Sequence, residues 1–274
     1  MGRRSLSNEW IAIPRPAISP RVRLLCFPHG GGNAHTFYPW SGILPKDVEV
    51  CAVQLPGRGL RLHEAPPTSV EQVIEPLWEA LQPLRDTPIA FFGHSLGASV
   101  AFEFAHLLQS KSIPLVHLFV SGASAPQLPS REAPIRDLPD REFIAEVRQR
   151  YEGLPEQILR DDGMVAMFLP ALRADFTMAE TYRNVDSPKL KCPISALGGH
   201  QDGGVTVYEL AAWRERTCGA FGFRMFPGGH FFVDSARQSV LRYVSEDLER
   251  SLRGELGKSK ALLHAVDDRG EIES

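Results

Sequence analysis

Two kinds of hydrophobic pattern alternate along the chain. Short apolar runs of strand length lie at 22–27, 48–55, 89–92, 115–120, 194–197 and 223–226. Between them, apolar residues recur every three or four positions over 70–84, 96–108, 207–216 and 233–252, which is the spacing of helices with one buried face. Runs that are apolar at consecutive positions are typical of strands covered on both sides. The alternation therefore predicts an α/β fold with a mainly parallel sheet and helices on both faces.

One long stretch interrupts this alternation. Between about residues 122 and 186 no strand-like run occurs, whereas 139–150 has helical character and a second helix carries an apolar stripe. The stripe consists of Val165, Phe168, Leu169, Leu172 and Phe176. We predict a helical lid at 126–185, inserted into an α/β core at 22–125 and 186–253. This stripe has two possible roles. All of it packs against the core, or a part of it contacts substrate, namely Phe168, Leu172 and Phe176. Residues 1–21 are expected to be an N-terminal extension and 254–274 a disordered tail.

Composition narrows the function further. The 274-residue chain has a net charge of −3, so it lacks the basic excess of a nucleic-acid-binding protein. Its four cysteines form neither a CxxC pair nor a metal-binding cluster, and we expect them to be reduced and structural. No apolar run has the length of a signal peptide or a membrane span. We therefore expect a cytoplasmic protein without a metal ion or organic cofactor and without a membrane or nucleic-acid partner.

The strongest chemical signal is the sequence Gly93-His94-Ser95-Leu96-Gly97. It follows the predicted strand 89–92 and opens the predicted helix 96–108, which is the context of a G-x-S-x-G nucleophile elbow. In this turn the serine adopts a strained backbone conformation, and the glycines avoid collisions with the neighbouring strand and helix. The α/β pattern and this turn together predict an α/β-hydrolase with Ser95 as nucleophile.

A serine nucleophile needs a histidine base, which follows it in the chain order of this fold. His230 lies in a Pro-Gly-Gly-His turn between the last predicted strand and a helix, so its ring can reach the sheet edge. His264 lies in the polar tail, and His200 lies in an earlier glycine-rich turn. We therefore assign His230 as the base.

The third member of the site should be a carboxylate that holds the histidine tautomer. Asp202 follows the predicted strand 194–197 in a glycine-rich turn, in the position expected for this acid. Asp175 in the lid and Asp186 in a linker are competitors, and Asp234 is too close to His230 in sequence. Asp202 is the preferred assignment, although aspartates are also common in turns for structural reasons.

An acyl-transfer site also needs donors for the oxyanion. The backbone N–H of Leu96 is one, since it follows the nucleophile. We assign the second to the N–H of Gly30 in the glycine-rich turn His29-Gly30-Gly31-Gly32 that follows the first long strand. His29 either shapes this loop or contacts substrate.

Five segments resemble the type II thioesterases that accompany modular polyketide and nonribosomal peptide synthetases. They are FPHGGGNAHTFYPW, VQLPGRGLRLHE, FFGHSLGA, LPALRADFTMAETY and FPGGHFF. The resemblance covers residues 23–252, and the second and fourth segments are far more specific than G-x-S-x-G. Gly30 and Leu96 stand where alanine and methionine are frequent, which leaves the backbone donors unaffected.

The resemblance implies hydrolysis of acyl groups from the phosphopantetheine arm of acyl- or peptidyl-carrier proteins, which removes stalled or aberrant chains. Separately, we expect the protein to be a monomer. The sequence shows no basic surface on the lid for such acidic partners, because 126–186 contains eight arginines and twelve acidic residues. Arg58 and Arg61 could contact phosphate, but we expect them to be solvated surface residues.

The sequence leaves three alternative functions open. A chain-terminating, medium-chain acyl-carrier-protein thioesterase of fatty acid synthesis would share every catalytic residue. A general carboxylesterase would not explain the lid segment. A non-enzymatic protein with a hydrolase fold would be expected to lack Ser95, Asp202 or His230, and all three are present.

Overall fold

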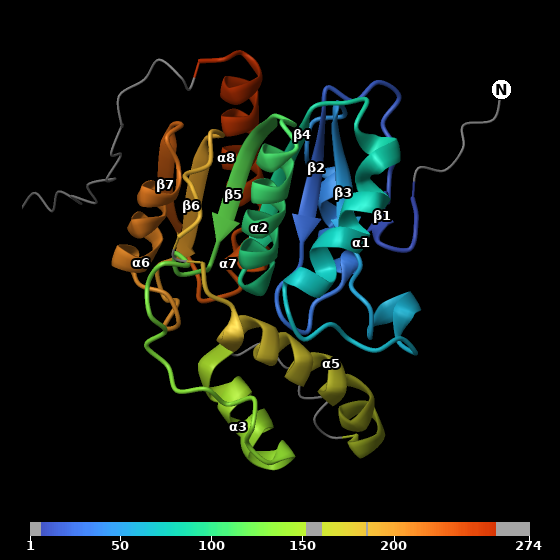
Figure 1. Ribbon diagram of the computed structural model, residues 1–274, viewed down its shortest axis with the longest axis vertical. Helices are drawn as coiled ribbons and strands as arrows, with labels where there is room; N and C mark the ends of the chain where they lie inside the picture. Colours follow the sequence, from blue (N-terminus) through green and yellow to red (C-terminus); the bar gives the residue numbers. More distant parts are fainter. Residues whose placement is uncertain (1–6, 152–160, 185, 256–274) are drawn as a thin grey trace, which may run out of the picture.

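The computed structural model describes residues 7–151, 161–184 and 186–255. Its centre is a seven-stranded sheet in the order β1-β3-β2-β4-β5-β6-β7 (Figure 1). The strands are β1 (Ile11–Ala12), β2 (Val22–Phe27), β3 (Val48–Val53), β4 (Ile89–His94), β5 (Leu115–Ser121), β6 (Ile194–Gly199) and β7 (Phe221–Phe226). All neighbouring strands are parallel except the short β1, which is antiparallel to β3. The predicted α/β fold is confirmed.

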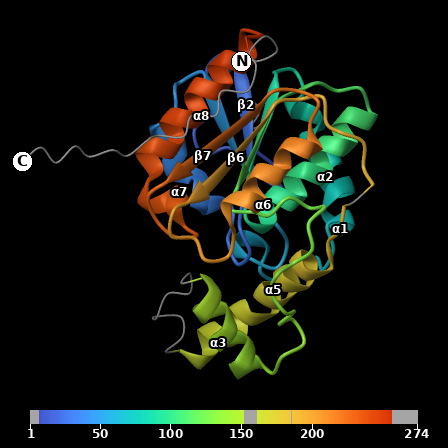
Figure 2. The same cartoon turned by 90° about the vertical axis from the view of Figure 1, so that its left-hand side faces the viewer.

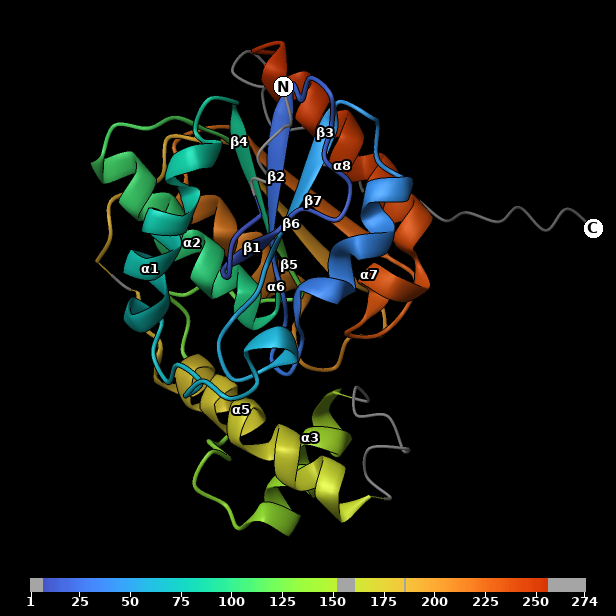
Figure 3. The ribbon, with the colours of Figure 1, turned by 90° about the vertical axis from the view of Figure 1, so that its right-hand side faces the viewer.

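Helices cover both faces of this sheet, as Figure 3 shows from the side. On one face lie α1 (Glu71–Leu81), α2 (Leu96–Ser110) and α6 (Val207–Ala211). On the other lie α7 (Phe232–Ser235), α8 (Arg237–Leu252) and a 3-10 helix at Ala34–Gly42. The predicted helix at 207–216 changes to a 3-10 helix at Ala212–Arg216, and the one at 233–252 is divided into α7 and α8.

The six-residue strand β2 shows why the apolar runs are continuous. All six of its residues are buried. Successive side chains point to opposite faces, so Leu25 and Phe27 join the hydrophobic cluster under α1 and α2, whereas Leu24 and Cys26 join the cluster under α8. Each face therefore has its own core.

The N-terminal segment is not wholly an extension. Ile11 is fully buried and pairs with Val53 across the β1–β3 ladder, and Ile13 is buried in the same core cluster. Two residues are too few to show the period of a strand, which is why the sequence did not predict β1. The predicted tail lies almost entirely outside the described residues.

Two helices lie below the carboxyl ends of the strands, outside the two layers that cover the sheet (Figure 1, Figure 2). They are α3 (Asp140–Tyr151) and α5 (Asp162–Thr181), and both fall within the predicted lid. The side chain of Asp161 caps α5 by accepting hydrogen bonds from the backbone N–H groups of Gly163 and Met164. Phe143, Val147 and Leu172 form a small hydrophobic cluster between the two helices. The exact limits of the lid stay a prediction.

The described part of the chain contains no helix both long and apolar enough to cross a membrane. All four cysteines are free thiols; Cys26, Cys51 and Cys192 are buried, and Cys218 is exposed. The structural role expected for all four therefore fits the three buried thiols better than Cys218.

Candidate active site

Ser95 lies in a sharp turn between β4 and α2, with φ of 55° and ψ of −122°. A positive φ is rare outside glycine and costs on the order of 1–3 kcal/mol, so the surrounding structure must hold it. The backbone N–H of Ser95 donates to the carbonyl oxygen of Ser121 at 2.7 Å. A Cβ on Gly93 would lie 2.3 Å from the carbonyl oxygen of Gly97, and one on Gly97 would lie 2.2 Å from that of Phe27. Both glycines are thus required by backbone contacts, as the motif predicted.

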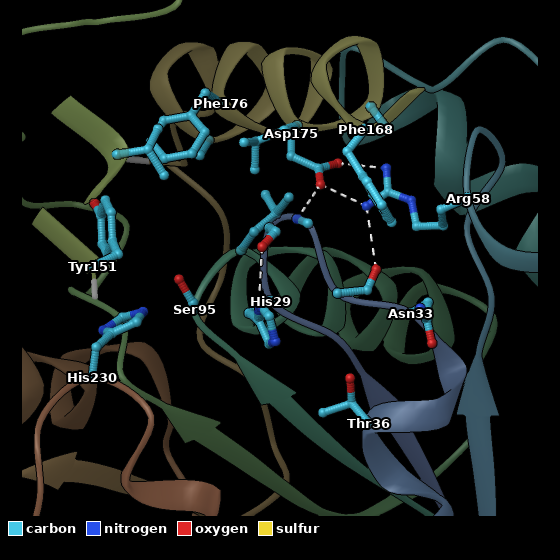
Figure 4. Close-up of a pocket in the computed structure, with 18 of the residues that line it drawn as sticks. His29, Asn33, Thr36, Arg58, Ser95, Tyr151, Phe168, Asp175, Phe176 and His230 are labelled. Carbon is cyan, nitrogen blue, oxygen red and sulfur yellow. Dashed lines mark hydrogen bonds and ion pairs between the residues drawn. The ribbon is translucent and has the colours of Figure 1, made fainter. Parts of the chain in front are cut away.

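The structure brings His230 and Asp202 together. Nδ1 of His230 lies 2.9 Å from a carboxylate oxygen of Asp202, and the two side chains are only 6% and 2% exposed. Because a carboxylate accepts, Nδ1 carries the proton and Nε2 retains its lone pair. Figure 4 shows Ser95 and His230 on the same side of one cavity. The catalytic roles of the three residues stay a prediction that this geometry supports.

Among the described residues, none of the competing side chains pairs with His230. Asp186 and His200 are exposed, whereas Asp175 is buried on α5 in an ion pair with Arg58. Asp234 pairs with Arg237 on the surface. His264 lies outside the described residues.

The cavity beside Ser95 has a volume of about 370 Å³ and lies between the sheet and the lid. Phe168, Leu172 and Phe176, the stripe residues predicted to contact substrate, all line it. His29 also lines it, as does Tyr151, which the sequence did not single out. The Tyr151 ring packs edge-on against the His230 ring with centroids 5.0 Å apart, so α3 contacts the candidate base directly. Only the three-dimensional arrangement of α3 reveals this contact.

A second, more polar cavity of about 190 Å³ adjoins the first at Ser95. Ser95, Leu96, Tyr151 and His230 line both cavities. The polar side chains that line only the second are Ser99, Ser124, Ser130, Arg131, Glu132, Tyr182, Arg183 and Glu209. The candidate nucleophile thus lies between an apolar and a polar compartment.

Gly30 and Leu96, the predicted oxyanion donors, both line the apolar cavity. Neither backbone N–H has a hydrogen-bond acceptor among the residues that the structure describes. Nδ1 of His29 lies 2.8 Å from the carbonyl oxygen of Gly30 and must donate to it. Burial lowers the pKa of His29 and so favours the neutral ring, in which Nδ1 carries the proton donated to Gly30. His29 therefore shapes the loop.

Arg58 and Arg61 are buried, so the expectation that they are solvated surface residues is wrong. Two nitrogens of Arg58 bind the two carboxylate oxygens of Asp175 at 2.5 and 2.7 Å, and the side chains are 3% and 1% exposed. Arg61 pairs with Glu64 and lies over the ring of Trp10. The sequence around Arg58 does not reveal its burial, because its carboxylate partner Asp175 lies 117 positions away.

His94 packs behind the candidate base, with the ring centroids of His94 and His230 5.1 Å apart. Its Nδ1 lies 3.0 Å from the hydroxyl of Ser121. Burial, and secondarily the neighbouring His230, lowers the pKa of His94 well below its ordinary value. A neutral ring here places no positive charge against the imidazolium that His230 would become. Among the described residues, no group of three or more His, Cys, Asp or Glu side chains is arranged to hold a metal ion.

The parallel sheet, the strained serine turn after β4 and the late histidine together define an α/β-hydrolase. A family model of the thioesterase domain matches residues 22–248, and the chain belongs to this family.

Individual proteins are also similar to this chain over most of its length. The gramicidin S biosynthesis protein GrsT of Aneurinibacillus migulanus is 42% identical, over 88% of this chain and 94% of GrsT. The structure of BorB, a type II thioesterase from the borrelidin biosynthetic cluster, matches with a TM-score of 0.81 and 40% identity, over 88% of this chain and 98% of BorB. The medium-chain S-acyl fatty acid synthase thioesterase of Rattus norvegicus is 33% identical, over 84% of this chain and 89% of that protein.

Proposed function

We propose that this protein is a type II thioesterase that hydrolyses acyl groups from the phosphopantetheine arm of carrier proteins in a polyketide or nonribosomal peptide pathway. The observation that carries the proposal is the position of Ser95, which lies between an apolar and a polar cavity and beside the buried His230–Asp202 pair. The similarity to GrsT and BorB supports the biosynthetic context.

The chemistry follows from the positions of the side chains. Nε2 of His230 takes the hydroxyl proton of Ser95 as the serine oxygen attacks the thioester carbonyl, and Asp202 stabilises the imidazolium. The N–H groups of Leu96 and Gly30 stabilise the oxyanion. The proton then passes from His230 to the departing pantetheine thiolate. Water activated by His230 hydrolyses the acyl-enzyme and restores Ser95.

The two cavities suggest how the substrate is oriented. Phe168, Leu172 and Phe176 offer an apolar wall to the acyl chain. The hydroxyls and charged groups of the second cavity suit the amide-rich pantetheine arm, which needs hydrogen-bond partners when it leaves water. The scissile thioester then lies at Ser95, where the cavities meet.

The deciding experiment measures release of acyl groups from loaded carrier proteins by intact-protein mass spectrometry. Acetyl, propionyl, butyryl and octanoyl carriers are compared with the matching acyl-CoA esters, using wild type and Ser95→Ala. We expect Ser95-dependent unloading of short acyl chains from the carriers. Cleavage of acyl-CoA or simple esters without unloading of any carrier would refute the carrier-protein proposal and leave the hydrolase chemistry intact.

The same panel tests the alternative function, chain termination in fatty acid synthesis. The similarity to the rat medium-chain thioesterase favours it as the second candidate. It predicts that activity rises steeply from acetyl to octanoyl carriers, whereas an editing enzyme unloads the short chains readily.

We further propose that the enzyme acts as a monomer in the cytoplasm. Every proposed catalytic group comes from one chain, so the site needs no second subunit. Light scattering coupled to size exclusion tests the oligomeric state, and fractionation of the producing cells tests the location.

A further inference from the structure

We propose that Arg58 and Asp175 are positioning residues that fix the Gly30–Gly31 peptide and thereby aim the Gly30 N–H at the oxyanion. This inference rests on the proposed function, because it assigns a role within the same acyl-transfer site. It goes beyond the triad by making the lid helix α5 part of the oxyanion-binding structure.

The contacts converge on one carboxylate. Oδ2 of Asp175 accepts a hydrogen bond from the backbone N–H of Gly31 at 2.6 Å and another from Arg58 at 2.5 Å. Oδ1 of Asp175 accepts from the second terminal nitrogen of Arg58 at 2.7 Å. Arg58 also donates weakly to the carbonyl oxygen of Gly32 at 3.4 Å. Figure 4 shows these bonds on the side of the cavity opposite His230.

The Gly30–Gly31 peptide is held at both ends. Its N–H binds Asp175, and its carbonyl oxygen, which points the opposite way in a trans peptide, accepts from Nδ1 of His29. Gly31 has a φ of +76°, so the chain reverses sharply at this point and would otherwise be free to rotate. Fixing this peptide limits the orientation of the adjoining peptide that carries the Gly30 N–H. That N–H has no acceptor among the described residues and lines the cavity.

Three distant segments meet at this point. The glycine-rich loop follows β2, Arg58 follows β3, and Asp175 lies in the middle of α5. Asp175 occupies the buried face of α5 beside Leu172 and Met178, where an unpaired carboxylate would be strongly unfavourable. Arg58 neutralises it and also determines which way its oxygens point. Any shift of α5 would move the acceptor of the Gly31 N–H, so the geometry links the lid to the oxyanion donors.

A positioning role and a purely structural role of the Arg58–Asp175 pair predict different enzyme activities. Two double variants distinguish the two roles. Arg58→Met/Asp175→Asn removes both charges but leaves an amide oxygen that can accept from Gly31. Arg58→Met/Asp175→Leu removes both charges and the acceptor. Replacing both partners of a buried pair with uncharged groups of similar size is often tolerated, so neither variant leaves an unpaired buried charge.

The assay is hydrolysis of acetyl- and butyryl-N-acetylcysteamine, which needs no carrier protein. The Asp175→Leu double variant should have a kcat/KM at least about 10-fold below that of the Asp175→Asn double variant, because misplacing a reacting group by about 1 Å can cost 10²-fold. An alkyl trifluoromethyl ketone, whose adduct with Ser95 carries an oxyanion, should lose affinity in the same ratio. An acyl amide analogue without an oxyanion should bind both variants equally well.

The matched control is the buried pair Arg23–Glu49, with side chains 4% and 2% exposed and an N···O distance of 2.6 Å. It lies at the start of β2 and β3, at the other end of the sheet from Ser95. Arg23→Met/Glu49→Gln should lower thermal stability without changing kcat/KM or ketone affinity at a temperature where the protein is folded.

Equal kcat/KM values for the two Arg58/Asp175 double variants would overturn the proposal, as would parallel losses of ketone and amide affinity. If a double variant does not fold, Arg58→Lys provides the second test. It should lower ketone affinity selectively, since lysine cannot bind both carboxylate oxygens as arginine does. A failure of the proposed function would instead appear as wild-type enzyme that cleaves the small thioesters but unloads no carrier.

Discussion

Gly97→Ala should move the two N–H donors of the proposed oxyanion site apart without changing the chemical identity of any catalytic side chain. A Cβ at residue 97 would lie 2.2 Å from the carbonyl oxygen of Phe27 and 2.6 Å from that of Pro28. Ordinary van der Waals contact needs about 1 Å more than the shorter distance. Both obstacles are backbone atoms, so no side chain can rotate away and α2 must move relative to the end of β2.

The movement of α2 changes the geometry of the proposed oxyanion site. Leu96 begins α2, whereas Gly30 lies two residues after Pro28, so the displacement increases the separation between the two N–H donors. We expect kcat/KM to fall by about 10²-fold, the cost of a misplacement near 1 Å. Forcing an extra methyl group into a packed site should also cost about 1–3 kcal/mol of unfolding free energy.

The assay is hydrolysis of butyryl-N-acetylcysteamine, followed by the release of free thiol, with urea unfolding of the same samples. Gly42→Ala is the control, because a Cβ there meets nothing within 4 Å and its φ is not in the positive region. It should leave both activity and stability nearly unchanged. A folded Gly97→Ala enzyme with activity within about 3-fold of wild type would refute the argument that α2 must move and that this distance matters.

Three further outcomes are expected. Asp202→Asn should lower kcat by about 10³–10⁴-fold while the protein stays folded, because the amide no longer favours the required His230 tautomer. Thioester hydrolysis by the variant and by wild type, measured at fixed times, checks this. Burial lowers the pKa of His117 to about 4, so the folded protein holds this ring neutral. The contribution of the neutral ring to the unfolding free energy is complete above pH 6.5 and is lost as the pH falls toward 4. In urea titrations, the unfolding free energy of wild type should fall between pH 7 and pH 5 by about 2 kcal/mol more than that of His117→Gln. Ala171→Leu, which narrows the apolar cavity, should reduce the octanoyl-to-acetyl ratio of kcat/KM by about 10-fold or more, and an unchanged ratio would show that the acyl chain lies elsewhere.

Local features of the sequence were enough to predict the sheet and the nucleophile turn. Most positions of the strands β2 to β7 are apolar because helices cover both faces of the sheet, and this leaves a clear signal in consecutive residues. The serine turn is equally local, since its glycines are required by neighbours within the strand–turn–helix unit and by the adjacent end of β2. The positions of His230 and Asp202 followed from chain order and from glycine-rich turns at strand ends, and the structure places them 2.9 Å apart.

Contacts between distant segments could not be predicted in the same way. Arg58 was expected to be solvated because arginine is rarely buried without a partner, and only the packing of α5 against the loop supplies Asp175 as that partner. Likewise, Tyr151 gave no signal until the position of α3 brought its ring against His230. Periodicity records which face of an element is buried, but it does not record what covers that face. The sequence by itself determined the sheet, the elbow and the candidate triad, whereas the tertiary structure alone decided how the lid meets the oxyanion loop, because that contact depends on segments more than a hundred residues apart.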